Sequence, residues 1–413
     1  MTPRRAGIDL AVTDVTPAPL VHVRRRGHVE SVHRGHVAVV DASGRLIAHA
    51  GEPHLLIYPR SSFKPFQALP LVESGAFSRS GLGADALALI AGSHGGTDAH
   101  AALAAAILAS ADATVADLAC GTHSPFDKPT AETLRARGEA PGPLRHNCSG
   151  KHAGMLLLAR FLGAPLSGYT QPDHPVQQRI WATFEEVAGE PFTDDEPAID
   201  GCSAPNPWMP LSTLAFAFAL LGRGVDAAGS TSPALAAIRD AMRGYPQFVA
   251  GEGFLDTALM RSLPGIVTKI GAEAVHAIAL PDLGWGVAIK AADGAGRATP
   301  PAAVEVLKQL RVLDPRDLAA RHRLEIPLFV IERAFHEVVR DAHRVVRVLE
   351  EDRAVRLPVD RGVVAQLDQL VRLLLLLPLA QDERLDVGMV GVEDHHFCGP
   401  AGLSARLDDA GGS

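Results

Sequence analysis

The chain has 413 residues, and 47% of them are hydrophobic, which is ample for a buried core. Its formal net charge of -8 and its isoelectric point near 6.1 leave no basic surplus for a nucleic-acid backbone, so we expect a small-molecule ligand. No uninterrupted apolar run approaches the ~20 residues that a membrane span needs, so we expect no membrane partner.

The first residues do not read as a signal peptide. Arg4 and Arg5 resemble a charged start, but no apolar stretch of the required length follows before Arg24. The cysteines are too few and too scattered for a disulfide framework, which is typical of a reducing compartment. They are Cys120, Cys148, Cys202 and Cys398. We therefore expect a cytoplasmic protein with reduced thiols.

The N-terminal part predicts strands. Residues 36–40 and 46–50 have β-forming side chains and are joined by the turn residues 41–44, which predicts a hairpin. A third run, 55–58, ends at Pro59. The pattern then becomes helical, and residues 62–251 are expected to be mostly α-helix, interrupted by glycine and proline loops.

Strand signals return after this helical region. Residues 265–270 and 275–280 flank a turn, and residues 286–291 form a third run. One antiparallel sheet, built from N- and C-terminal segments and covered by helices, would bury these strands most simply. The fold class predicted is therefore α/β (α+β), in the arrangement of serine β-lactamase-like proteins, with a large helical middle region.

The C-terminal region, residues 301–413, carries no recognisable chemical motif. Helical periodicity covers 301–313 and 328–349. His395 and His396 stand beside Cys398 but lack the spacing of metal ligands, so a disordered tail is favoured over a metal site. We expect this region to be helical at first and then partly disordered.

A Ser-x-x-Lys pattern lies where a strand gives way to a helix. Ser61 and Lys64 are three residues apart, so a helix would place them on one face. Serine becomes a good nucleophile when a base takes its proton, and a lysine can be that base if burial lowers its pKa. The alternative is an N-capping serine with a solvated lysine. By itself the pattern is weak.

Two later segments could complete such a site. Gly92, Ser93, His94 and Gly95 form a loop that lets backbone N–H groups approach a ligand, although it also fits an ordinary helix C-terminus. Lys269 stands near the end of an expected strand, as the lysine of the β-lactamase K-T-G element does. The S-D-N element and the threonine after the lysine are missing, which speaks against penicillin recognition.

Two cysteines lie in polar loops. Cys148 and Lys151 stand at the start of an expected helix, and Cys202 follows Asp200 in a proline-rich loop. The first segment is not a phosphate-binding loop, because Arg145 replaces the required glycine. The two cysteines lack zinc-finger spacing, so packed core thiols and a shared metal site both stay open.

Taken together and in this order, these motifs resemble the rhizobial-type L-asparaginases. The resemblance covers residues 18–300, which we expect to form the catalytic domain. It implies a homodimer with a β-lactamase-like fold that hydrolyses L-asparagine to L-aspartate and ammonia. The sequence departs from the family at Ala274, where glycine is usual, and the expected C-terminal segment does not align after about residue 313.

The resemblance also implies roles for individual residues. Ser61 with Lys64 would form one catalytic pair, with Ser61 as nucleophile, and Ser93 with Lys269 a second pair that relays protons and lowers the pKa of Lys64. One zinc ion per chain would be held by Cys148, Lys151, Cys202 and water. The residues expected to bind the substrate are Arg60, His94, Gly95 and Asp200.

Two other functions remain as alternatives at this point. One is a penicillin-interactive or esterase-like serine hydrolase, which turnover of a chromogenic cephalosporin would identify. The other is a zinc-binding regulatory protein of the same fold without catalysis. The presence of both Ser–Lys pairs argues against this second alternative.

Overall fold

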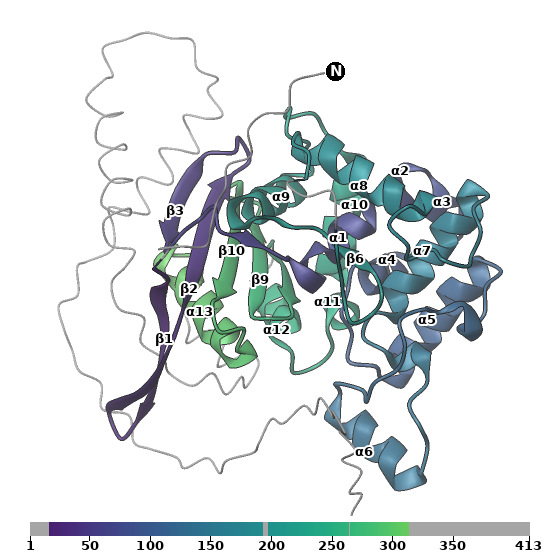
Figure 1. Cartoon of the computed structure of the whole chain (residues 1–413), viewed down its shortest axis with the longest axis horizontal. Coiled ribbons are helices and arrows are strands. Elements are labelled where there is room, and N and C mark those ends of the chain that lie inside the picture. Colours follow the sequence, from purple (N-terminus) through teal and green to yellow (C-terminus); the bar gives the residue numbers. More distant parts are fainter. Residues whose placement is uncertain (1–15, 193–196, 264, 314–413) are drawn as a thin grey trace, which may run out of the picture. The chain divides into compact units, whose positions relative to one another are not determined.

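An antiparallel sheet joins the two ends of the described chain (Figure 1). The computed structural model describes residues 16–192, 197–263 and 265–313. Six strands form the sheet in the order β1-β2-β10-β9-β8, with β3 paired to β2. Their bounds are β1 Ala18–Arg25, β2 His28–Asp41, β3 Leu46–Ala50, β8 Val267–Gly271, β9 Val275–Leu280 and β10 Trp285–Ala291.

The central pairing brings distant segments of the sequence together. Strands β2 and β10 pair from Asp41 opposite Trp285 to Gly35 opposite Ala291. The β2–β3 turn is fixed by the carboxylate of Asp41, whose Oδ1 accepts hydrogen bonds from the backbone N–H groups of Ser43 and Arg45. Such a local bond from an aspartate to the backbone is typical of turns.

Helices and short strands fill the chain between β3 and β8. The helices are α1 Lys64–Gln67, α2 Leu69–Glu73, α3 Ala76–Arg79, α4 Ala84–Ile90, α5 Asp98–Ser110, α6 Lys128–Arg137, α7 Ser149–Leu162, α8 Pro175–Ala188, α9 Leu211–Arg223, α10 Pro233–Gly244, α11 Pro246–Val249 and α12 Leu255–Ser262. Helix α13, Thr299–Gln309, follows the sheet. The short 3₁₀ helices are η1 Arg60–Phe63, η2 Val115–Asp117, η3 Pro143–Arg145 and η4 Gly296–Ala298. Two small sheets pair β4 (Leu56–Ile57) with β7 (Met209–Pro210), and β5 (Ala198–Ile199) with β6 (Pro205–Asn206).

Helices α9 and α13 both pack on the sheet, and every residue of β9 is buried, so neither face of that strand is open to solvent. The contact with α9 is unusually close. A Cβ atom at Gly286 in β10 would overlap the carbonyl oxygen of Ala215 in α9. A glycine is therefore required at this position for the helix to lie on the sheet.

The structure confirms the predicted fold class: a mixed α/β protein with one antiparallel sheet drawn from both ends and a helical middle region. Strand β1 and the first half of β2 were not expected, and α13 starts at Thr299 and contributes to the core. The expected helix at 328–349 and the tail with His395, His396 and Cys398 lie outside the described residues. Among the described residues, no helix is both long and apolar enough to cross a membrane.

Candidate active site

The Ser-x-x-Lys segment starts at a strained backbone position. Arg60 has φ +54, a left-handed conformation that is uncommon for a residue other than glycine. The chain then forms η1 and enters α1, and the backbone N–H of Lys64 bonds to the carbonyl of Ser61. Phe63 packs edge-on against Phe184 with ring centroids 4.9 Å apart. This apolar contact holds η1 in place and so fixes the direction in which the side chain of Lys64 extends from the start of α1.

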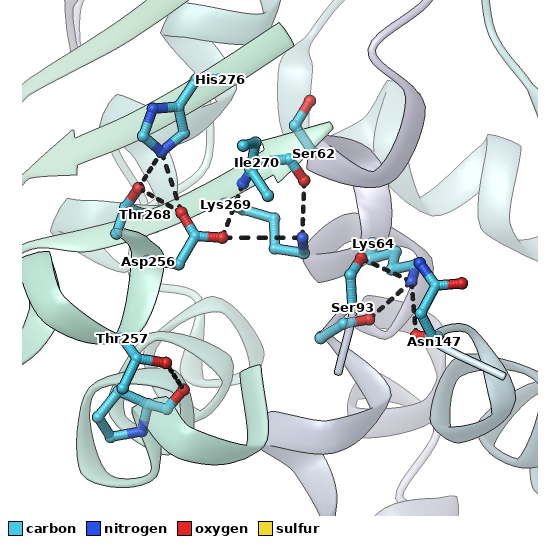
Figure 2. A network of polar contacts seen from close by, with 12 residues as sticks. Ser62, Lys64, Ser93, Asn147, Asp256, Thr257, Thr268, Lys269, Ile270 and His276 are labelled. Atoms are coloured by element: carbon cyan, nitrogen blue, oxygen red, sulfur yellow. Dashed lines mark hydrogen bonds and ion pairs between the residues drawn. The ribbon is translucent and has the colours of Figure 1, made fainter. Parts of the chain in front are cut away.

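Lys64 is buried and its amine reaches three oxygen atoms (Figure 2). The Nζ atom lies 2.7 Å from the carbonyl oxygen of Gly92, 2.8 Å from Oγ of Ser93 and 3.3 Å from the carbonyl oxygen of Asn147. The carbonyls can only accept a hydrogen bond, whereas the hydroxyl can also donate. The amine can therefore donate to all three oxygens, and in its neutral form it can also accept a proton from a hydroxyl.

The charge balance at Lys64 favours this neutral form. Burial is the main effect that lowers its pKa. Cys148 opposes burial, and Lys151 reinforces it by charge repulsion. From the sequence, this repulsion was expected to come from Lys269. In the structure the nearby lysine that lowers the pKa of Lys64 is Lys151.

Ser61 is half-buried in η1, and its hydroxyl makes no hydrogen bond to any described residue. It stands where strand β8 approaches η1 closely. A Cβ atom at Gly271 would lie 2.7 Å from the carbonyl oxygen of Pro59 and 3.3 Å from the backbone nitrogen of Ser62. Only glycine allows this approach without displacement of η1. The close approach of β8 thus fixes the position of the Ser61 segment.

The hydrogen bonds pair the catalytic candidates differently from the expectation. Lys64 bonds to Ser93 and not to Ser61, because the carbonyls of Gly92 and Asn147 hold its amine at the Ser93 loop. Lys269 does not bond to Ser93. Its Nζ donates to the carbonyl of Ile270 at 2.7 Å.

Lys269 is also fully buried, beside the carboxylate of Asp256. Its Nζ lies 3.9 Å from Oδ2 of that residue. Burial lowers the pKa of Lys269 to about 7; Asp256 opposes this effect and Lys64 adds to it. A lysine of that pKa can exchange a proton near neutral pH, as acid–base catalysis requires.

Of the expected substrate-binding residues, two lie in the Ser93 loop and have structural partners. His94 is fully buried, and its Nε2 lies 3.0 Å from Oγ of Ser149. Burial is the main cause that lowers its pKa well below the ordinary value. The carbonyl of Gly95 accepts a hydrogen bond of 2.9 Å from the backbone of Asp127. Both residues shape the loop and turn away from solvent.

The other two expected substrate-binding residues bind each other. Nε of Arg60 lies 2.5 Å from Oδ1 of Asp200, and Nδ2 of Asn206 donates to Oδ2 of Asp200 at 2.8 Å. Oδ1 of Asn206 accepts from the backbone N–H of Arg60 at 3.2 Å. This partly exposed bridge ties the Ser61 segment to the loop of Cys202.

Cys148, Lys151 and Cys202 come together next to Lys64. Nζ of Lys151 donates to Sγ of Cys202 at 3.0 Å, and Sγ of Cys148 lies 3.4 Å from Oδ1 of Asn147. A hydrogen bond with Cys202 lowers the pKa of the Cys148 thiol well below its usual value, and both lysines reinforce this against the effect of burial. Burial alone favours neutral Lys151, but the two sulfur groups raise its pKa.

The donor set of this cluster suits a soft divalent metal. Two sulfur atoms and one amine converge, and the ring of His152 is buried beside Cys202. Thiolate and nitrogen donors are those that zinc prefers. Among the described residues, no group of three His, Cys, Asp or Glu side chains is placed to hold a metal, so the third donor would have to be Lys151.

The sequence analysis missed three residues of this site. Asn147 supplies a carbonyl to Lys64, and its side chain contacts Cys148. Asp256 faces Lys269, and His276 bonds to Asp256. For Asn147 the polar segment 146–152 was a usable signal. For Asp256 and His276 there was none, because a single acid in a first helical turn and a single strand histidine are common.

Solved structures with a similar chain path share little sequence with this protein. The protein Mglu matches with 14% identity and a TM-score of 0.41, over 68% of this chain and 67% of that chain. A β-lactamase from Mycobacterium bovis matches with 14% identity and a TM-score of 0.36, over 68% and 95%. The probable glutaminase ybaS matches with 14% identity and a TM-score of 0.37, over 72% and 92%. The chain thus spans about two thirds of the Mglu chain.

The sequence itself identifies the family. No curated protein matches the chain. A family model described as L-asparaginase II matches residues 21–331, which is well over half of the chain. This match confirms the resemblance to asparaginases, supports an amidohydrolase, and does not favour the penicillin-interactive, esterase-like or regulatory alternatives. The chain belongs to the L-asparaginase II family.

Proposed function

We propose that the protein hydrolyses L-asparagine to L-aspartate and ammonia, with Ser61 as nucleophile and Lys64 as base. The observation that carries this proposal is the contact set of Lys64. A buried amine between two carbonyl acceptors and the hydroxyl of Ser93 is arranged to hold and pass one proton. Family membership supports an amide as the substrate class.

The proposed reaction begins with attack by the oxygen of Ser61 on the side-chain amide carbon, while Lys64 takes the hydroxyl proton. Ser93 then gives its proton to the departing nitrogen and receives one from Lys64, so the C–N bond breaks and ammonia leaves. Water next attacks the ester on Ser61, releases L-aspartate and restores the hydroxyl. The backbone N–H of Ser61 would stabilise the oxyanion, since those of Arg60 and Ser62 already bond to Asn206 and Pro59.

The proposed reaction predicts an order of preference among substrates. Ammonia release from L-asparagine should exceed that from L-glutamine by at least about tenfold in kcat/KM, since one methylene in a fitted pocket is worth this much. A chromogenic cephalosporin should not be turned over. A preference for L-glutamine would replace the proposed substrate, and absence of ammonia release from every amide would end the proposal.

The proposal includes one zinc ion per chain, held by Cys148, Lys151 and Cys202. The convergence of these three donors supports it. When bound there, zinc would supply a positive charge that orients the charged end of the substrate. Lysine can bind a metal only after it loses its proton, so the chain must release a proton from Lys151 on loading.

We expect Cys202→Ser to lose zinc and to raise KM by more than it lowers kcat, because an orienting contact acts as uniform binding. Elemental analysis of protein purified without chelator measures the metal. Cys120→Ser is the matched control, since this buried thiol lies by the carbonyls of Gly121 and Pro143 and is no proposed ligand. Wild-type protein that lacks zinc and cannot be reloaded by dialysis would contradict the assignment.

The resemblance to rhizobial-type asparaginases also carries two coarser proposals. The protein would be a homodimer, and it would act in the cytoplasm. Light scattering should then give about twice the chain mass of 43.5 kDa. A monomer at micromolar concentration would contradict the first proposal.

A further inference from the structure

A buried polar network lies behind Lys269 and is not used in the proposed reaction (Figure 2). Its centre is Asp256, a fully buried residue in the first turn of α12. Oδ1 of Asp256 accepts from the hydroxyl of Thr268 at 3.0 Å and lies 3.0 Å from Nε2 of His276. Oδ2 accepts from the backbone N–H of Ile270 at 2.9 Å and lies 3.9 Å from Nζ of Lys269. Oδ1 thus has two close polar partners, and Oδ2 has one hydrogen-bond donor and one amine within ion-pair range.

His276 contacts two other side chains of this network. Nε2 of His276 faces both Asp256 and Oγ1 of Thr268, so it carries the hydrogen. Nδ1 of the same ring is buried and has no partner among the described residues. Lys269 is the lysine within ion-pair range of Asp256.

We propose that Asp256 is a positioning residue for Lys269: its carboxylate, held by Thr268 and His276, fixes the amine of Lys269 beside Lys64. This inference rests on the proposed function, because it gives Lys269 a part in the same site. Two contacts determine where the amine lies. One is the carbonyl of Ile270 at 2.7 Å and the other is the carboxylate at 3.9 Å. The backbone N–H of Ile270 also bonds to Asp256, so one peptide segment aligns both partners.

The carboxylate also determines how Lys269 holds its proton. The groups that face this amine are Asp256 from α12, Lys64 from α1 and Cys148 at the start of α7, and His276 of β9 stands behind Asp256. Burial lowers the pKa of Lys269 to about 7, and Asp256 is the largest effect that opposes burial. Removal of this negative charge must therefore lower the pKa further. The neutral form of Lys269 would then be favoured over a wider pH range.

Asp256 itself stays ionised in the folded protein. Burial would raise its pKa, but the hydrogen bond from His276, and then Lys269 and the Ile270 N–H, lower it to about 2. Above about pH 3.9, the ordinary pKa of an aspartate, the network therefore makes its full contribution to the stability of the fold. That contribution is lost as the pH falls toward about 2.

A titration of Lys269 tests the proposal directly. The chain has only six lysines, so protein carrying ¹³C-labelled lysine gives few ε-carbon signals, and Lys269→Arg identifies the relevant one. In wild-type protein this signal should titrate near pH 7. In Asp256→Asn it should titrate at least about one unit lower, the effect expected when an opposite charge at this range is removed. The control is Asp282→Asn, the same change at an exposed turn, which should leave the titration in place.

Kinetics supply a second readout. Asp256→Asn should lower kcat about 10- to 100-fold with KM changed by less than about threefold, because a displaced catalytic group costs rate and not binding. One limb of the pH–rate profile should report the ionisation of Lys269. In Asp256→Asn this limb should move to lower pH, as the titration of the Lys269 signal does. Asp256→Glu keeps the charge but moves it, so it should restore the titration more fully than it restores kcat.

The proposal is overturned if Asp256→Asn leaves the Lys269 titration unchanged, or if wild-type Lys269 titrates near the ordinary value of about 10.4. The titration of Lys269 in the wild-type protein tests the proposal even if the Asp256→Asn protein does not fold. The titration needs no substrate, so it also separates this inference from the proposed function. A shifted Lys269 in a protein that releases no ammonia would contradict the function alone.

Discussion

Ser61→Ala should reduce ammonia release by about 1000-fold or more, because only binding and oxyanion stabilisation remain when the nucleophile is removed. The hydroxyl of Ser61 bonds to no described residue, so its loss should leave the fold intact. Steady-state ammonia assays and thermal unfolding of the same preparation measure both effects.

The neighbouring serine gives a matched control for this variant. Ser62 is buried and donates to the carbonyl of Pro59 at 2.6 Å, so Ser62→Ala should cost about 1 kcal/mol of stability while activity is largely retained. A folded Ser61→Ala protein with more than a tenth of wild-type activity would exclude Ser61 as nucleophile. Activity lost only with Ser93→Ala would then point to Ser93, the hydroxyl that Lys64 contacts.

Lys64→Met should lose about 1000-fold in kcat, since the site would have no group to take the serine proton. Methionine has a similar length and carries no charge, so it can occupy the buried position without an unpaired ion. The carbonyls of Gly92 and Asn147 lose a donor, so we expect the unfolding temperature to stay the same or to fall. Kinetics and calorimetry on one preparation distinguish lost chemistry from lost structure.

A second substitution at Lys64 separates a base from a fixed positive charge. Arginine keeps the charge but does not release its proton, so Lys64→Arg should be as inactive as Lys64→Met. Recovery of more than a tenth of the activity in a folded Lys64→Arg protein would show that the position needs a cation and not a base. Lys308→Met, on the exposed surface of α13, is the control and should be fully active.

Periodicity in the sequence was enough to predict the main architecture but not every strand of the sheet. Residues 275–280 and 46–50 were placed as strands with the bounds that the structure has. Strand β1 was missed because its inner residues, such as Leu20 and Val21, are followed by the charged run from Arg24. That run lies in an exposed hairpin, and pairing with β2 keeps it in a strand despite its poor propensity.

The candidate residues were predictable where they belong to short motifs, and not where they meet through the fold. Ser61, Lys64 and Ser93 belong to short motifs that carry their own signal. The contact of Lys64 with the carbonyl of Asn147 depends on how α1 and α7 pack, and no residue type marks a backbone carbonyl. Asp256 and Lys269 are 13 residues apart, and only the meeting of α12 with β8 brings them into ion-pair range.

The pairing of β2 with β10 has a consequence for biosynthesis. About 240 residues separate Asp41 from its partner Trp285, so at 5–20 residues per second a ribosome needs about 12–50 s between making the two strands. During that interval the inner edge of β2 has no partner, and the nascent chain carries Ser61 and Lys64 without Lys269. The catalytic site therefore cannot assemble during translation of the first two thirds of the chain. Exposed β2 is the segment at which we expect a chaperone to protect the growing polypeptide from aggregation.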